Sequence, residues 1–103
     1  MEQQLQAFIT YLHNVKKTST NTELSYKRDL AKLQKFLAAR GITETEQVSA
    51  SDLEAYIQDL NENGFKAATV SRNIASMKAF FGYVVREQGI KEDPSAGLKS
   101  PKI

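Results

Sequence analysis

Residues Lys66 to Arg86 read KAATVSRNIASMKAFFGYVVR, and this stretch decides the fold of the 103-residue chain. At about 100° per residue its apolar side chains fall on one side, which predicts a helix with one face in a hydrophobic core. The stretch holds four basic residues and no acidic one. The predicted core residues are Val70, Ile74, Met77, Phe81, Val84 and Val85.

The opposite side of this predicted helix carries small residues where a solvated face normally carries Glu and Lys. Its members are Arg72, Ala75, Ser76, Ala79, Gly82, Tyr83 and Arg86. Such a face suits a close neighbour. The neighbour is either a phosphate backbone, whose charge the arginines would neutralise, or another helix of the same chain, and this stretch alone favours neither.

Charge is divided unevenly along the chain, although the net charge is only +2. Residues 16–40 hold seven basic and two acidic residues, whereas residues 41–65 hold six acids and no base. Together with the basic stretch above, this division predicts two basic elements facing a polyanion and one acidic element turned away from it. A chance arrangement on a small protein is the alternative.

Three further helices are predicted, over about residues 2–15, 20–40 and 51–63, from apolar residues at helical spacing. Two of them are expected to begin at capping boxes, formed by Thr20 with Glu23 and by Ser51 with Glu54. No segment alternates with period two, so we expect an all-α domain without a sheet.

The helix over residues 20–40 carries a second basic stripe. Its core side is predicted to hold Tyr26, Leu30, Leu33 and Leu37. Its outer side carries a row of cations formed by Arg28, Lys32 and Lys35. Such a row is usually only a solvated face, but beside a polyanion it would contact phosphates.

Several classes of site are disfavoured by composition. The chain has no Cys and a single His, His13, so neither a thiol nucleophile nor a His-based zinc site can be assembled, and no metal or cofactor is predicted. The acidic side chains of the third helix are interpreted as solubilising rather than catalytic. No apolar run is long enough to span a bilayer and no signal peptide is recognisable, so we expect a cytoplasmic protein without a membrane partner.

The last residues, 89–103, contain both prolines of the chain and read as a linker after a domain over residues 1–88. Because the sequence stops directly after this linker, we expect it to be a piece of a longer protein.

Three segments in order carry a family resemblance: TELSYKRDLAKLQKFL, GFKAATVSRNIASMKAFFGYVVREQGI and EDPSAGLKSPK. The first contains T-x-x-x-Y-x-x-D-L, the second S/T-x-x-R followed by [SA]-x-[KR]-x-F-F, and the third a D/N-P-S/A linker. Over nearly its whole length the chain resembles the N-terminal core-binding domain of tyrosine recombinases, most closely the Xer-type and phage-integrase-type members.

The resemblance implies a compact four- to five-helix SAM-like bundle that clamps one side of duplex DNA while a C-terminal catalytic domain closes the other. The second and fourth helices would meet DNA, and these are the two basic helices found above. The residues that the resemblance implies as contacts are Thr22, Ser25, Tyr26 and Arg28 in the second helix and Thr69, Arg72, Ser76 and Lys78 in the fourth. The cations expected on phosphates are Arg28, Lys32, Lys35, Arg72, Lys78 and Arg86.

The family's nucleophilic tyrosine and its phosphate-stabilising residues lie in the catalytic domain, so no catalytic residue is predicted here. The chain is expected to be a DNA-binding monomer, with other recombinase protomers joining the full-length protein in a synaptic complex.

Two alternatives stay open. The Ala/Gly face of the fourth helix suits a helical protein-interaction module without a DNA role. Within the family, the first helix could instead serve mainly to contact a neighbouring protomer, and Leu5, Phe8 and Leu12 would then be partly exposed.

Overall fold

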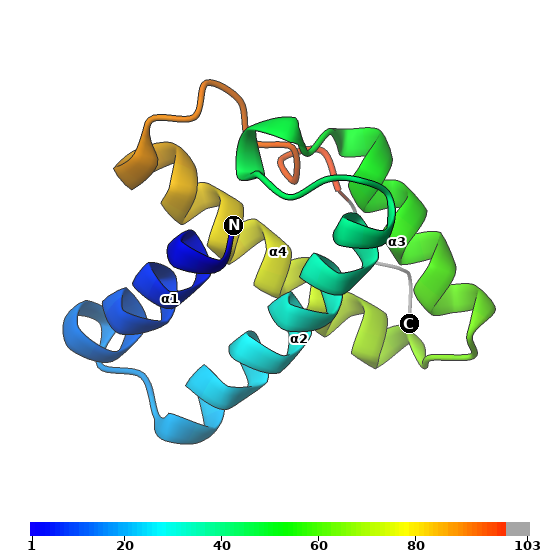
Figure 1. Cartoon of the computed structure of the whole chain (residues 1–103). Coiled ribbons are helices and arrows are strands. Elements are labelled where there is room, and N and C mark those ends of the chain that lie inside the picture. The colour runs from blue at the N-terminus through cyan, green and yellow to red at the C-terminus, as the bar shows by residue number, and fades with distance from the viewer. Residues whose placement is uncertain (99–103) are drawn as a thin grey trace.

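A computed structural model describes residues 1–98, and every regular element within this range is helical (Figure 1). The all-α class predicted from the sequence is thereby confirmed. In chain order the elements are α1 (Glu2–Tyr11), the π-helix η1 (Leu12–Lys16), α2 (Thr20–Ala39), the 3₁₀-helix η2 (Thr45–Gln47), α3 (Ala50–Glu62) and α4 (Ala67–Gln88).

Helix α4 runs through the middle of the molecule and packs against α1, α2 and α3 (Figure 1). Five of its six predicted core residues are buried, and Val85 is half-buried. The core also takes in Tyr83, which the sequence placed on the open side of this helix. Its ring centroid lies 5.5 Å from that of Phe8 and 5.0 Å from that of Tyr11. That placement was wrong because a helix with three neighbours buries more than one stripe.

The first helical segment has nearly the predicted length, but its last turn is π-helical rather than α-helical. Its α-helical hydrogen bonding ends at Tyr11, and one π-helical turn leads to Lys17, whose φ of 57° is left-handed. The backbone N–H of Thr18 donates to the carbonyl of Leu12 at the end of this helix. The second alternative predicted that Leu5, Phe8 and Leu12 are partly exposed for contact with a neighbouring protomer. All three side chains are buried, so this alternative is wrong for them.

Both predicted capping boxes were wrong by one or two residues. Helix α2 is capped by Ser19, whose hydroxyl accepts from the N–H of Thr22, while Glu23 turns away to accept from Thr18. Helix α3 begins at a reciprocal box between Ser49 and Asp52.

The chain after α4 does not simply leave the bundle. Gly89 ends the helix in a left-handed conformation, and Ser95 and Leu98 further along are buried. Leu98 lines a hollow with Ile57 and Asn61 of α3. A domain boundary at residue 88 stays a prediction, and residues 99–103 of the predicted linker lie outside the described residues. Within residues 1–98, no helix is both long and apolar enough to cross a membrane.

Candidate nucleic-acid interface

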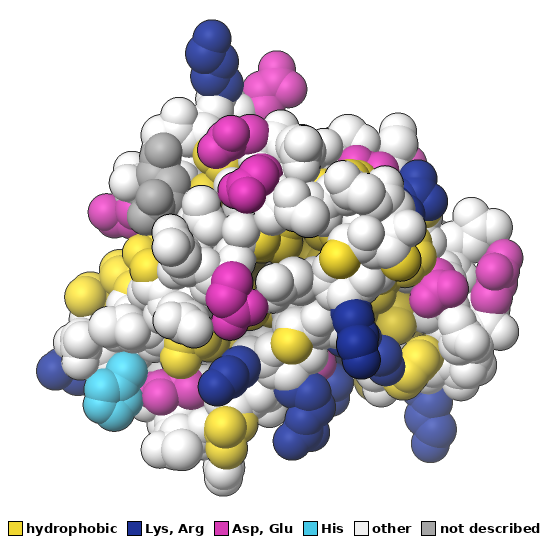
Figure 2. All heavy atoms as spheres, in the orientation of Figure 1, with side chains coloured by type: hydrophobic (Ala, Val, Ile, Leu, Met, Phe, Trp, Pro, Cys, Tyr) yellow, Lys and Arg dark blue, Asp and Glu magenta, His cyan; other side chains and the backbone are white. Residues whose placement is uncertain are grey.

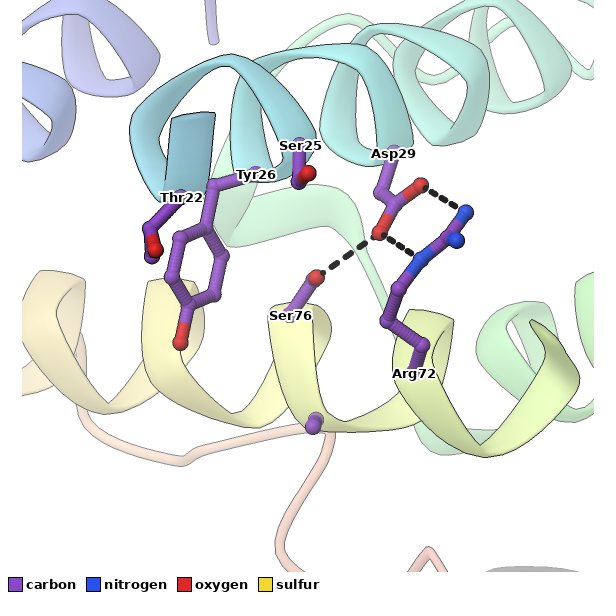
Figure 3. Close-up of a pocket in the computed structure, with 7 residues that line it drawn as sticks. Thr22, Ser25, Tyr26, Asp29, Arg72 and Ser76 are labelled. Carbon is purple, nitrogen blue, oxygen red and sulfur yellow. Dashed lines mark hydrogen bonds and ion pairs between the residues drawn. The ribbon is translucent and has the colours of Figure 1, made fainter. Parts of the chain in front are cut away.

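Helices α2 and α4 enclose an open hollow of about 240 Å³, here called the α2–α4 hollow (Figure 3). Five residues implied as DNA contacts line it together: Thr22, Ser25 and Tyr26 from α2, and Arg72 and Ser76 from α4. Asp29 and Ala75 complete the lining. The fold therefore gathers residues separated by more than forty positions in the sequence into one surface feature.

Asp29, which also lines this hollow, was not singled out from the sequence. Its Oδ2 accepts from Nε of Arg72 at 3.0 Å and its Oδ1 accepts from Nη2 at 2.9 Å (Figure 3). The hydroxyl of Ser76 donates to Oδ2 at 3.1 Å. The available signal was an acid at the D of T-x-x-x-Y-x-x-D-L, placed next to the buried Leu30 within a basic segment.

Burial differs sharply between the two partners of this ion pair. The Asp29 side chain is 5% exposed, whereas that of Arg72 is 54% exposed. The side-chain hydrogen bonds to Asp29, followed by its charge, raise the pKa of Arg72, so the guanidinium stays a cation. The two charges of this pair thus balance each other within the lining of the hollow, while about half of the Arg72 side chain faces solvent.

The other lining residues offer a ring and hydroxyl groups. Tyr26 is half-buried, and its ring meets that of Phe8 edge-on at 5.7 Å, so this residue also belongs to the packing of α1 on α2. Thr22 and Ser25 are exposed on α2, and the hydroxyl of Thr22 lies 2.9 Å from that of Ser19. The hollow can therefore donate and accept hydrogen bonds around one guanidinium.

The predicted cations of α2 form a continuous exposed row, here called the α2 cation row: Arg28, Lys32 and Lys35. Figure 2 shows Lys and Arg side chains gathered in the lower part of the visible face, over α2. The ammonium of Lys32 lies 3.9 Å from the ring centroid of Phe65. Through this cation–π contact the α2 cation row packs against the turn before α4.

Three predicted contact residues of α4 lie outside the lining of the hollow. Lys78 and Arg86 are exposed further along the helix. Thr69 is half-buried, and its carbonyl accepts from the side chain of Asn73. The structure therefore brings Arg72 and Ser76 of α4 together with residues of α2 in the hollow and leaves these three apart.

The interpretation of the small-residue face as a surface for another helix of the same chain is confirmed for part of it, whereas contact with a phosphate backbone stays a prediction. Ser76 and Tyr83 are buried against other helices of the same chain. Arg72, Ala75 and Arg86 are exposed and leave part of α4 open to a partner.

The profile of the phage integrase N-terminal SAM-like domain matches residues 5–88. The chain belongs to this family. Thr22, Tyr26 and Asp29 of the T-x-x-x-Y-x-x-D-L segment and Arg72 of the S/T-x-x-R segment are among the residues that line the α2–α4 hollow of this SAM-like domain.

Curated relatives agree with the family assignment. The chain is 35% identical over 89 residues to the tyrosine recombinase XerC of Listeria welshimeri. The aligned residues make up 86% of this chain and 30% of that protein. It is 31% identical over all 103 residues to XerC of Roseiflexus castenholzii and 33% identical to XerC of Herpetosiphon aurantiacus, covering 33% and 34% of those proteins. The chain therefore spans about a third of the length of the curated relatives it matches. No solved structure matches it significantly.

Proposed function

We propose that this chain is the DNA-binding core-binding domain of a site-specific tyrosine recombinase, and that α2 and α4 hold one side of a duplex. The observation that carries the proposal is the meeting of five family-implied contact residues in the α2–α4 hollow, directly beside the α2 cation row. Cleavage and rejoining of strands would belong to a catalytic domain of a longer protein, acting with other protomers.

The two parts of this surface suit different parts of DNA. The α2 cation row, together with Lys78 and Arg86, would neutralise phosphates and set the position of the duplex. The hydroxyls of the hollow and the guanidinium of Arg72 would approach a groove, where arginine recognises base edges. Sequence preference would thus arise from the hollow and most of the affinity from the row.

Salt dependence tests the proposal. Among residues 1–98, no ion pair is found for the three cations of the row, Lys78 or Arg86. Five phosphate contacts predict that log K falls with log salt at a slope of about −4.5, and about −5.4 if Arg72 adds a sixth. Fluorescence anisotropy of the chain on a mixed-sequence duplex of about 30 base pairs, at about 50 to 200 mM salt, measures this slope.

A matched pair of variants locates the contact. Lys35→Ala removes a cation from the row, and Lys91→Ala removes an equally exposed cation from the segment after α4. We expect Lys35→Ala to make the slope shallower by about 0.9 and Lys91→Ala to leave it unchanged. Equal effects of the two variants would contradict an interface on α2. The absence of binding at the lowest salt, with salt-independent capture of a protein partner, would instead favour the interaction-module alternative.

A further inference from the structure

Asp29 places a negative charge within the surface that is proposed to bind a polyanion, and its hydrogen bonds indicate why. We propose that Asp29 is a positioning residue that holds the guanidinium of Arg72 in one orientation, with its third nitrogen, Nη1, outside the ion pair and free to bind DNA. This inference rests on the proposed function and deepens it, because it makes the Arg72 contact dependent on a residue that itself does not touch DNA.

The geometry of the pair restricts Arg72 strongly. Nε and Nη2 donate to different oxygens of one carboxylate, an arrangement that defines the plane of the guanidinium. The hydroxyl of Ser76 binds the same carboxylate from one turn further along α4, so Asp29 is itself held in place. An arginine without such a partner would have to be ordered when DNA binds, at a cost in conformational entropy.

The difference in burial argues against a purely structural ion pair. Asp29 is almost completely shielded from solvent, whereas more than half of the Arg72 side chain is exposed in the lining of the hollow. Burial of an ion pair rarely adds stability over apolar packing, and its best-supported use is to specify a geometry. Here the geometry specified is that of an exposed cation on the proposed DNA surface.

Charge alone and positioning predict opposite results for Asp29→Asn. If only charge matters, removal of the acid frees Arg72 to attract phosphates, and Arg72 then contributes more to binding. If Asp29 positions Arg72, the same change loosens the guanidinium, and Arg72 then contributes less. The sign of the coupling between the two residues therefore decides the question.

A double-mutant cycle measures that sign. The unaltered chain, Arg72→Ala, Asp29→Asn and the double variant are titrated onto the same mixed-sequence duplex at about 100 mM salt, after circular dichroism has shown that each is folded. We expect Arg72→Ala to weaken binding about tenfold in the native background and less than about threefold in the Asp29→Asn background. An equal or larger loss in the Asp29→Asn background, or no loss in either, overturns the inference. Absence of binding by the unaltered chain would overturn the proposed function as well.

A second measurement uses the unaltered chain without DNA, so it does not depend on whether any variant folds. The Nε–H group of Arg72 gives a nitrogen relaxation signal in the free chain, and the exposed Arg28 of the α2 cation row is the matched control. We expect an order parameter near that of rigid backbone, about 0.85, for Arg72 and a value below about 0.6 for Arg28. An Arg72 side chain as mobile as that of Arg28 overturns the inference, whatever the DNA titrations show.

Discussion

Gly82, within α4, should stabilise the domain when it is replaced by alanine. An added Cβ would meet only Nη1 of Arg86, at an ordinary contact distance of 3.6 Å. Inside a helix, alanine is favoured over glycine by about 0.5–1 kcal/mol, mainly because glycine loses more backbone freedom on folding. Since about 1 kcal/mol shifts the Tm of a domain of this size by about 4–8 °C, we expect Gly82→Ala to raise Tm by about 2–8 °C.

The same substitution at Gly64 provides the control, and its effect should have the opposite sign. Gly64 also has open space around its Cα, with no atom within 4 Å of an added Cβ, but its φ is +82°. An alanine forced into this left-handed conformation costs about 1–2 kcal/mol. Contacts alone would predict that both substitutions are harmless, whereas backbone conformation predicts a gain at one position and a loss at the other.

Thermal and urea unfolding followed by circular dichroism measure both effects, with the free energy of unfolding compared at a fixed pH. A lower free energy of unfolding for Gly82→Ala would refute the reasoning, because it would mean that α4 has no room for a methyl group there. A change of the same sign at both positions would refute the assignment of the effect to φ.

Two further predictions concern the segment after α4 and the start of α3. Leu98→Ala should lower the free energy of unfolding by about 2–3 kcal/mol, as measured by urea unfolding. This is the low end of the range for a buried leucine, because Leu98 also borders a surface hollow. A loss below about 0.5 kcal/mol would show that the segment after α4 does not support the core. The backbone N–H of Ser49, and more weakly its hydroxyl and Arg40, lower the pKa of Asp52 from its ordinary value of 3.8. A lowered pKa means that the stabilisation by Asp52 is present above pH 3.8 and is lost as the pH falls through the folded value, so unfolding measured from neutral to acidic pH should be less pH-dependent in Asp52→Asn. An identical pH dependence in both chains would contradict this role of the cap.

The helices and most of the core could be predicted because helical periodicity is a local property of the sequence. It gave five buried apolar residues of α4 but left out Phe80, which is 1% exposed. It misplaced Tyr83 because the number of neighbours around a helix is decided by the tertiary fold. The predicted starts of α2 and α3 were wrong for a different reason. Ser49 and Ser51 each precede an acidic residue by three positions, and only the hydrogen bonds between Ser49 and Asp52 in the structure show which serine caps α3.

The candidate site could be predicted only in part, because charges summed along the sequence do not show which charges pair in space. Residues 16–40 carry a local excess of positive charge, yet Arg40 pairs with Asp52 from the acidic segment. Asp29, one of the two acids in that basic segment, pairs instead with Arg72 of α4. These pairings cross the segment boundaries that the sequence suggested.

The remaining charge is therefore distributed differently from the count along the chain. Within the described residues, no ion pair is found for the α2 cation row, although Glu2 lines a hollow with these cations, whereas the charge of Arg72 is balanced by Asp29. Long-range attraction to a polyanion depends on unbalanced charge, so on the proposed function it comes mainly from α2. Arg72 then acts at short range, where the direction of a hydrogen bond matters more than net charge. On the proposed function, Asp29 weakens the long-range attraction of Arg72 to DNA but fixes the direction of its hydrogen bonds. A carboxylate within a DNA-binding surface is consistent with this division.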